Sequence, residues 1–195
     1  MSKKISLLEA GEKLARGAVG IIPTDTIYGI VASAFNKEAV SRVYVTKGRR
    51  PKKSSIILIS TPEDVERFGC KMTSGLSEKL ASYWPGPVSV VLETNRDDLK
   101  YLHRGAYTFA FRIPNDQRLQ EMLKISGPII APSANPEGLT PAKNIEEAEK
   151  YFGEKVDFFV DGGEMDGEAS AIVSFEDSIA KVLRSNSYFE GLKNA

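Results

Sequence analysis

The sequence predicts a single α/β domain built on a mixed, twisted sheet with helices packed against it. Predicted strands and helices largely alternate early in the chain, whereas the closing strands at 171–175 and 181–183 have no helix between them. The chain has 195 residues, enough for one sizeable core and short for two. Because no linker, repeat or low-complexity tract marks a boundary, we expect residues 1–195 to form one domain.

Helices are expected where apolar residues recur at helical spacing behind a capping residue. Ser6 and Glu9 have the spacing of a capping box, and Gly17 ends the helix that follows. Asn36 can cap a second helix that runs toward Lys47. The other expected helices are a short one opened by Pro62, one through Leu76 and Leu80, and those at 117–125 and 145–152.

Short apolar or alternating runs bounded by turn residues predict the strands. The first covers residues 18–22 and is closed by Pro23. The remaining expected strands lie at 55–60, 88–92, 108–113, 128–131, 156–160, 171–175 and 181–183.

Composition limits the classes of function. Lys plus Arg and Asp plus Glu each number 26, and this zero net charge argues against a protein that mainly coats nucleic acid or a membrane surface. The single cysteine, Cys70, excludes a disulfide framework and a zinc site of several thiolates, so we expect a small buried side chain. Glu9 interrupts the N-terminal apolar run and no stretch of about 18 apolar residues follows, so we expect a cytoplasmic protein without a membrane span.

Nucleophilic catalysis finds little support in the residues. His103 is the only histidine, and its neighbours suggest an exposed connection, which disfavours a Ser-His-Asp or Cys-His arrangement. The two commonest glycine-rich phosphate loops are absent from the sequence. A hydrolase is therefore a weak hypothesis.

Five cations fall within the seven residues 47–53. The negative end of a helix dipole would account for one or two of them. Pro51 makes the segment a loop between a helix and a buried strand, where the cations could neutralise the phosphates of ATP. The spacing alone leaves a phosphate site and a solvated loop as equal alternatives.

Small hydroxyl and amide side chains occupy three loops next to apolar strands, at 23–29, 131–136 and 167–170. Each loop taken singly could reflect turn chemistry. Ligands of open α/β sheets bind in the crevice at strand ends, so three such loops together favour a binding site.

Seven short motifs follow one another over nearly the whole chain. They are 23–29 (Pro-Thr-Asp-Thr-Ile-Tyr-Gly), Lys47 with Arg49, 84–87 (Trp-Pro-Gly-Pro), 108–112 (Thr-Phe-Ala-Phe-Arg), Ser133 with Asn135, 161–163 (Asp-Gly-Gly), and Leu183 with Arg184. This order resembles the YrdC/TsaC family of threonylcarbamoyl-adenylate synthases in its single-domain form.

The resemblance implies a YrdC-like fold and a nucleotidyltransferase that converts threonine, bicarbonate and ATP to threonylcarbamoyl-AMP and pyrophosphate. Other tRNA-modification proteins would then accept the adenylate to make N6-threonylcarbamoyladenosine in tRNA. We expect Mg²⁺ to be held mainly by the phosphates of ATP and by water, since no carboxylate cage is evident, and we assign no metal-ligating residue.

The resemblance also implies roles for particular residues. ATP would be bound by Lys47, Arg49, Lys53, Thr108, Ser133, Thr140 and Arg184. Threonine would be bound by Thr26, Tyr28, Arg112, Ala131 and Ser170, with Arg112 facing its carboxylate. Catalysis would depend on Lys47, Arg49, Ser133 and Asn135. We expect Lys47 and Arg49 on a solvent-facing loop, so that alanine at either position abolishes turnover and leaves the fold intact.

The chain departs from the family pattern at several positions. Arg50 separates the Lys-x-Arg motif from the proline that commonly follows it directly. Glu137 stands where a small residue is usual and adds a negative charge near the expected phosphates. Milder departures are Ser89, Ala171 and Ser174.

Three alternatives remain. A non-catalytic module of the same fold could bind RNA or a nucleotide, and a basic patch around 49–53 could contact tRNA weakly, although zero net charge weakens this reading. A carbamoyl transferase of the hydrogenase-maturation type would be much longer and cysteine-rich. A purely structural scaffold would leave the loops at strand ends unexplained.

Overall fold

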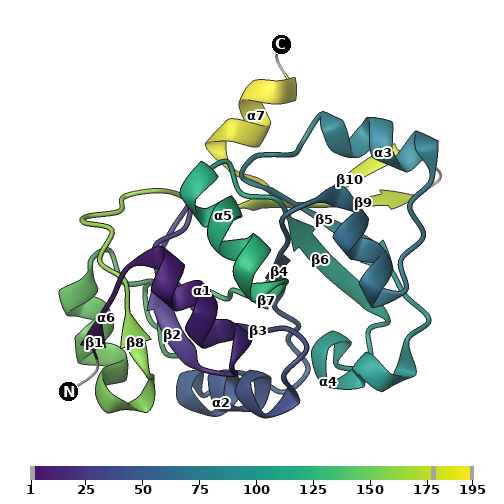
Figure 1. Cartoon of the computed structure of the whole chain (residues 1–195). Helices are drawn as coiled ribbons and strands as arrows, with labels where there is room; N and C mark the ends of the chain where they lie inside the picture. The colour runs from purple at the N-terminus through teal and green to yellow at the C-terminus, as the bar shows by residue number, and fades with distance from the viewer. Residues whose placement is uncertain (1–2, 177–178, 194–195) are drawn as a thin grey trace.

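The computed structural model describes residues 3–176 and 179–193, in which ten strands form one sheet (Figure 1). The strands are β1 (Lys3–Lys4), β2 (Val19–Ile22), β3 (Gly29–Ser33), β4 (Ile56–Leu58), β5 (Val88–Glu93), β6 (Thr108–Arg112), β7 (Ile129–Ile130), β8 (Phe158–Phe159), β9 (Ala171–Glu176) and β10 (Ile179–Arg184). Their order across the sheet is β1-β8-β2-β3-β7-β4-β6-β5-β9-β10. The pairs β1–β8, β2–β8, β4–β6 and β5–β9 are parallel and the other pairs are antiparallel, which confirms the predicted mixed sheet.

The helices begin largely where the capping residues predicted. They are α1 (Leu7–Ala15), α2 (Lys37–Lys47), α3 (Ser74–Ala81), α4 (Lys100–His103), α5 (Gln117–Ser126), α6 (Ile145–Phe152) and α7 (Ser187–Lys193), with short 3₁₀ turns η1 (Pro62–Phe68), η2 (Asp97–Leu99) and η3 (Gly153–Lys155). Ser6 and Glu9 form the predicted capping box of α1. The Asn36 side chain accepts a hydrogen bond from the Ala39 backbone N–H at the start of α2, as predicted.

Both faces of the central strands are buried, so successive residues of one strand enter different hydrophobic clusters. In β2, Ile21 packs with residues of α2 and α6, whereas Ile22 packs with residues of α1 and α5. Figure 1 shows α1 and α5 side by side across one face of the sheet, and these two helices pack against each other. The hydrophobic core therefore lies between the central strands and the helices that cover each of their two faces.

The local sequence predicts no strand at 29–33. In the structure β3 follows the loop after β2 directly and pairs antiparallel with β2. β7 is also antiparallel to β3, so β2 and β7 run in the same direction and end at the same edge of the sheet. The loops that follow these two strands, around Thr26 and Ser133, are consequently neighbours. An isolated bridge between Gly29 and Ser133 joins them.

His103 is buried in α4, so its expected place in an exposed connection is wrong. Its ring stacks on Tyr107 at 4.6 Å between centroids, and its Nδ1 accepts hydrogen bonds from the backbone N–H groups of Gly105 and Tyr107. Cys70 is 3% exposed, and burial raises the pKa of its thiol to about 12, as suits the expected buried side chain. In the described part of the chain, the helices are all too short or too polar to cross a membrane.

Candidate active site

A cavity of about 470 Å³ lies where several segments distant in sequence meet. They include the loop between β2 and β3, the loop after α2, the end of β6 at Arg112, the loop after β7, the segment around Ser170, and the end of β10 at Arg184. The sequence-predicted residues that line it are Thr26, Tyr28, Arg49, Lys53, Arg112, Ala131, Ser133, Asn135, Ser170 and Arg184. The loops at strand ends thus share one cavity, as the sequence predicted.

Three other predicted site residues do not line this cavity: Lys47, Thr108 and Thr140. Thr108 begins β6, opposite Glu93 of β5, and is only partly exposed. Thr140 is exposed, and its neighbour Pro141 contributes to the cavity wall instead. Among the described residues, neither threonine side chain forms a hydrogen bond with a lining hydroxyl.

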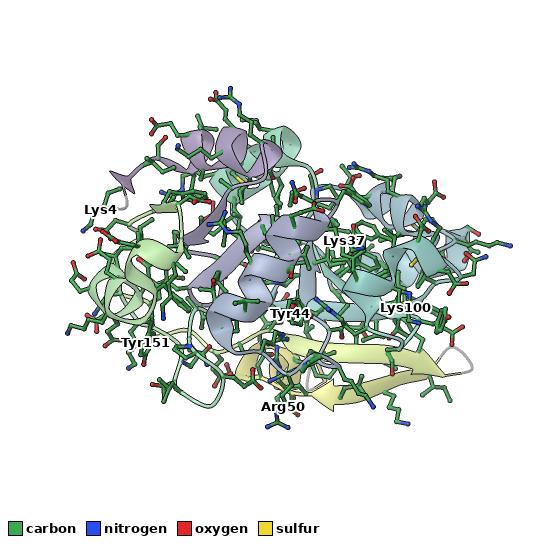
Figure 2. All side chains as sticks on the ribbon, turned by 90° about the horizontal axis from the view of Figure 1, so that it is seen from below. Lys4, Lys37, Tyr44, Arg50, Lys100 and Tyr151 are labelled. Atoms are coloured by element: carbon green, nitrogen blue, oxygen red, sulfur yellow. The ribbon has the colours of Figure 1, made fainter. Side chains whose placement is uncertain are left out.

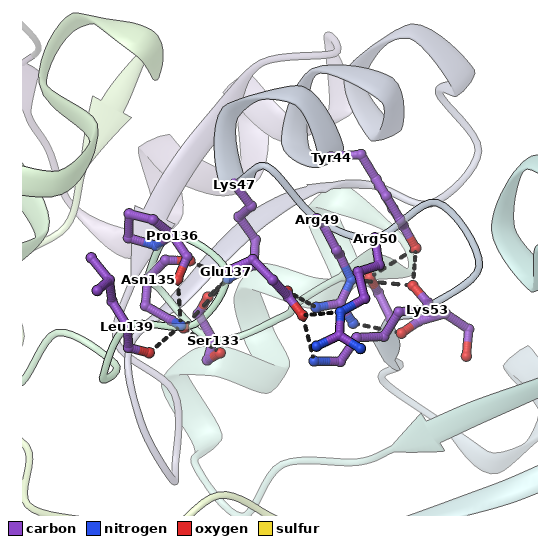
Figure 3. A network of polar contacts seen from close by, with 12 residues as sticks. Tyr44, Lys47, Arg49, Arg50, Lys53, Ser133, Asn135, Pro136, Glu137 and Leu139 are labelled. Atoms are coloured by element: carbon purple, nitrogen blue, oxygen red, sulfur yellow. Dashed lines mark hydrogen bonds and ion pairs between the residues drawn. The ribbon is translucent and has the colours of Figure 1, made fainter.

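Lys47 is 2% exposed, so its expected place on a solvent-facing loop is wrong. It occupies the last turn of α2, which Gly48 ends with φ +60°. The Lys47 Nζ donates to the carbonyl oxygen of Ser133 at 2.6 Å, to that of Asn135, and to the Asn135 Oδ1 at 3.4 Å (Figure 3). Burial, with a smaller contribution from the neighbouring charge of Arg49, lowers the pKa of Lys47 to about 7. In this structure Lys47 therefore holds the backbone of the Ser133 loop through its hydrogen bonds.

Asn135 closes the Ser133 loop. The Ser133 hydroxyl donates to the Asn135 Oδ1 at 2.6 Å, and the Asn135 Nδ2 donates to the carbonyl oxygens of Pro136 at 2.9 Å and Leu139 at 2.6 Å. The Ala134 N–H donates to the carbonyl oxygen of Tyr28 at 2.8 Å. These bonds fix the backbone that presents Ser133 to the cavity, the orienting role expected of Asn135.

Arg49 is held in the cavity wall by the backbone of its own loop. Its side chain is 8% exposed. The Nη2 donates to the carbonyl oxygen of Ser54 at 2.6 Å and the Nε to that of Lys53 at 3.2 Å. The hydroxyl of Tyr44 on α2 donates to the same Lys53 carbonyl at 2.8 Å. Figure 2 shows Arg50 projecting outward from the molecule near Tyr44, in keeping with its 82% exposed side chain.

Glu137 brings a carboxylate to this group of cations. Its oxygens lie 3.1 Å from the Lys53 Nζ, 3.7 Å from the Arg50 Nε and 3.9 Å from the Arg49 Nη1 (Figure 3). The hydrogen bond from Lys53 is the main cause that lowers the pKa of Glu137 below its usual range. Glu137, which departs from the family pattern, thus contacts the cations of the 47–53 segment directly.

Arg112 is buried, at 3% exposed, and points to the loop between β2 and β3. Its Nη1 donates to the Asp25 Oδ1 at 2.7 Å and to the Thr26 Oγ1 at 3.1 Å. Among the described residues its buried Nε has no hydrogen-bond partner. Burial lowers the pKa of Arg112, and the charge of Asp25 opposes this effect. The guanidinium thus lines the cavity with one buried donor that has no partner among the described residues.

Asp25, which had no predicted role, forms an ion pair with Arg112 of the cavity lining. Its side chain is 6% exposed, and its second oxygen accepts a hydrogen bond from the Asn115 N–H at 3.0 Å. Its position between Thr24 and Thr26, directly after a buried strand, was an available signal. Its ion-pair partner, Arg112, is 87 residues away in the chain.

Ser170, directly before β9, and Arg184, the last residue of β10, line the cavity together. The Arg184 Nε donates to the Ser170 carbonyl oxygen at 2.8 Å and the Nη2 to the Ser170 Oγ at 3.2 Å. The Ser170 Oγ is also 2.9 Å from the Oγ of Ser89, the residue that stands for the family's usual threonine. Burial lowers the pKa of Arg184.

Tyr28 lines the cavity and also holds the segment that contains Gly162 and Gly163. It is fully buried, and its hydroxyl donates to the Gly163 carbonyl oxygen at 2.9 Å and accepts from the Gly162 N–H at 2.8 Å. Burial raises the pKa of this phenol. The Asp-Gly-Gly motif is thus tied to the loop that bears Thr26.

The charges at the cavity suit an anionic ligand. Arg49, Lys53, Arg112 and Arg184 line it. The described lining residues include no carboxylate, although Glu137 contacts Arg49 and Lys53 and Asp25 contacts Arg112 from outside the lining. The described chain also contains no group of three or more His, Cys, Asp or Glu residues that could hold a metal ion. Serine and threonine hydroxyls supply neutral hydrogen bonds around the cations.

For the ATP substrate that the sequence predicts, replacing Tyr44 with phenylalanine should raise the KM about threefold to tenfold with little change in kcat, because one bond that holds the Arg49 loop is lost. Steady-state kinetics with varied ATP measures this. Tyr101→Phe is the matched control, since the Tyr101 hydroxyl donates to the Ala34 carbonyl at 3.0 Å, away from the lining residues. Equal KM values for the two variants would contradict a positioning role for Tyr44.

Comparison with known proteins gives a consistent result. A threonylcarbamoyl-AMP synthase of Bos taurus is 32% identical over 84% of this chain and 59% of its own length. One of Halorhodospira halophila is 27% identical over 78% of this chain and 81% of its own. The crystal structure of Pyrococcus abyssi Sua5 complexed with L-threonine superimposes with a TM-score of 0.83 at 28% identity, covering 91% of this chain and 53% of that one.

This chain therefore spans little more than half of the bovine and Pyrococcus proteins. The resemblance in sequence and the predicted fold class are both confirmed. The model of one family, described as "Telomere recombination", matches residues 12–186. On this match, which covers most of the chain, the protein belongs to the Sua5/YciO/YrdC family.

Proposed function

We propose that this protein is a threonylcarbamoyl-AMP synthase that uses ATP, threonine and bicarbonate. The observation that carries the proposal is the single cavity in which Arg49, Lys53, Arg112 and Arg184 meet the hydroxyls of Thr26, Ser133 and Ser170. The names of the relatives support this enzyme class.

The reaction needs no protein nucleophile. The amino group of threonine adds to bicarbonate with loss of water, and an oxygen of the resulting carbamate attacks the α-phosphorus of ATP. The bond between the α-phosphorus and its bridging oxygen breaks, and pyrophosphate leaves with the electron pair. The protein's task is to align the carbamate and to neutralise charge on the leaving group.

The residues divide between the two substrates. We assign Arg112 to the threonine carboxylate, because this buried cation lines the cavity, its Nη1 contacts Thr26, and its Nε has no partner among the described residues. Arg49 and Lys53 face the triphosphate, and Ser133 and Arg184 complete the nucleotide site. Lys47 acts by holding the Ser133 loop.

A divalent cation would arrive with the nucleotide. The lining residues offer cations and neutral hydroxyls, so we propose that Mg²⁺ is coordinated by phosphate oxygens and water. It would supply charge neutralisation at the phosphates. We further propose that the adenylate passes to other tRNA-modification proteins in the cytoplasm, where ATP and tRNA are both found.

Pyrophosphate release from ATP tests the proposal, with threonine and bicarbonate each omitted in turn. Release should require all three substrates, and threonylcarbamoyl-AMP should appear in equal amount. The proposal is wrong if release is absent with all three present, or if it continues unchanged without threonine.

A further inference from the structure

The cations assigned to the triphosphate already have an anion between them. The Glu137 carboxylate contacts Arg49, Arg50 and Lys53 at 3.1–3.9 Å, and its side chain is 19% exposed. Two of these cations line the cavity. A carboxylate with two oxygens among guanidinium and ammonium groups presents the same acceptor chemistry as a phosphate.

The backbone beneath Glu137 is fixed on both sides. Its N–H donates to the Lys47 carbonyl oxygen at 2.8 Å. The Asn135 amide holds Pro136 before it and Leu139 after it. Glu137 therefore has little freedom to leave the cations by movement of the loop, and rotation of its side chain is the available route.

A polyphosphate and Glu137 cannot both use the same N–H donors. If the carboxylate stayed in place, an incoming phosphate would also face a like charge at close range. We propose that Glu137 is an internal anion that occupies the polyphosphate subsite of the free protein and that a polyphosphate must displace it. This inference rests on the proposed function for its natural ligand, the triphosphate of a nucleotide.

The consequence is selectivity by charge. A polyanion replaces one carboxylate with several negative oxygens and so recovers every contact that Glu137 gives up. An anion of low charge recovers fewer. The carboxylate can also return to the cations when pyrophosphate leaves, which favours product release.

Titration calorimetry with inorganic triphosphate, without added metal, tests this directly. Glu137→Gln keeps the size of the side chain and removes its charge, and should bind triphosphate about tenfold more tightly than wild type, the scale of a few screened ion pairs. Glu137→Asp, with a shorter reach, should give an intermediate affinity. Glu12→Gln, exposed on α1, is the control for a change of net charge and should match wild type within about twofold.

Equal or weaker binding by Glu137→Gln would overturn the inference and make Glu137 an organiser of the cations instead. Absence of binding by both proteins would overturn it as well. Thermal unfolding of each variant verifies that the fold is retained. The pyrophosphate assay is independent: if it fails while Glu137→Gln still binds triphosphate more tightly, the proposed function is wrong and the internal anion stands.

Discussion

Replacing Arg112 with methionine should lower threonine-dependent pyrophosphate release about 100- to 1000-fold, the usual effect of removing one buried charged donor from a reacting complex. Arg112 is the buried cation that lines the cavity next to Thr26, in the proposed threonine pocket, so its loss should act on threonine. The KM for threonine should rise, whereas the affinity for ATP should stay close to that of wild type.

The same change leaves Asp25 buried without its cation, which should cost about 3–5 kcal/mol of stability. A matched double variant separates the two effects. Asp25→Asn combined with Arg112→Met removes both charges and should regain most of the stability, to within about 1–2 kcal/mol of wild type. Turnover should remain as low as in the single variant. Recovery of turnover in the double variant would show that Arg112 serves only to balance Asp25.

Much of the fold follows from local signals. The capping residues Ser6 and Asn36 mark the starts of α1 and α2, and Asn144 caps α6, predicted at 145–152. These signals act within one helical turn, so they can be read without knowledge of the rest of the chain.

The missed strand β3 shows where local signals end. Its residues, Gly29–Ser33, include glycine, alanine and serine, which have weak strand preference on their own. Pairing with β2 and β7 on its two sides makes the segment a strand. That information lies in tertiary contacts rather than in the segment.

The candidate site was predictable in outline, because its polar loops follow or precede strands that the sequence predicts. Polar loops at strand ends were expected to meet, and Thr26, Ser133 and Ser170 of those loops line one cavity. The burial of Lys47 was not predictable, because its acceptors lie 86 and 88 residues further along the chain. A lysine at a helix end, in a segment that also contains arginine and proline, is typical of an exposed side chain when only its neighbours in the sequence are considered.

Replacing Lys47 with methionine should lower the free energy of unfolding by about 2–3 kcal/mol at pH 7, since buried acceptors of Ser133 and Asn135 lose their donor. The expectation of an unaffected fold rested on a solvent-facing position, and the burial of Lys47 is the reason to expect a loss of stability instead. Lys37→Met, exposed at the start of the same helix, should change stability by less than about 0.5 kcal/mol.

The difference between wild type and Lys47→Met should grow as the pH rises. The pKa of Lys47 is about 7 in the folded protein and near 10.5 in an unperturbed lysine, so between these values the unfolded chain binds the extra proton. Stability therefore increases with pH across this window in wild type, and the methionine variant lacks this contribution. Urea unfolding at pH 7, 8 and 9 measures it, with Lys37→Met as the control. A difference that does not change with pH would mean that the folded state leaves the proton affinity of Lys47 as it is in the unfolded chain.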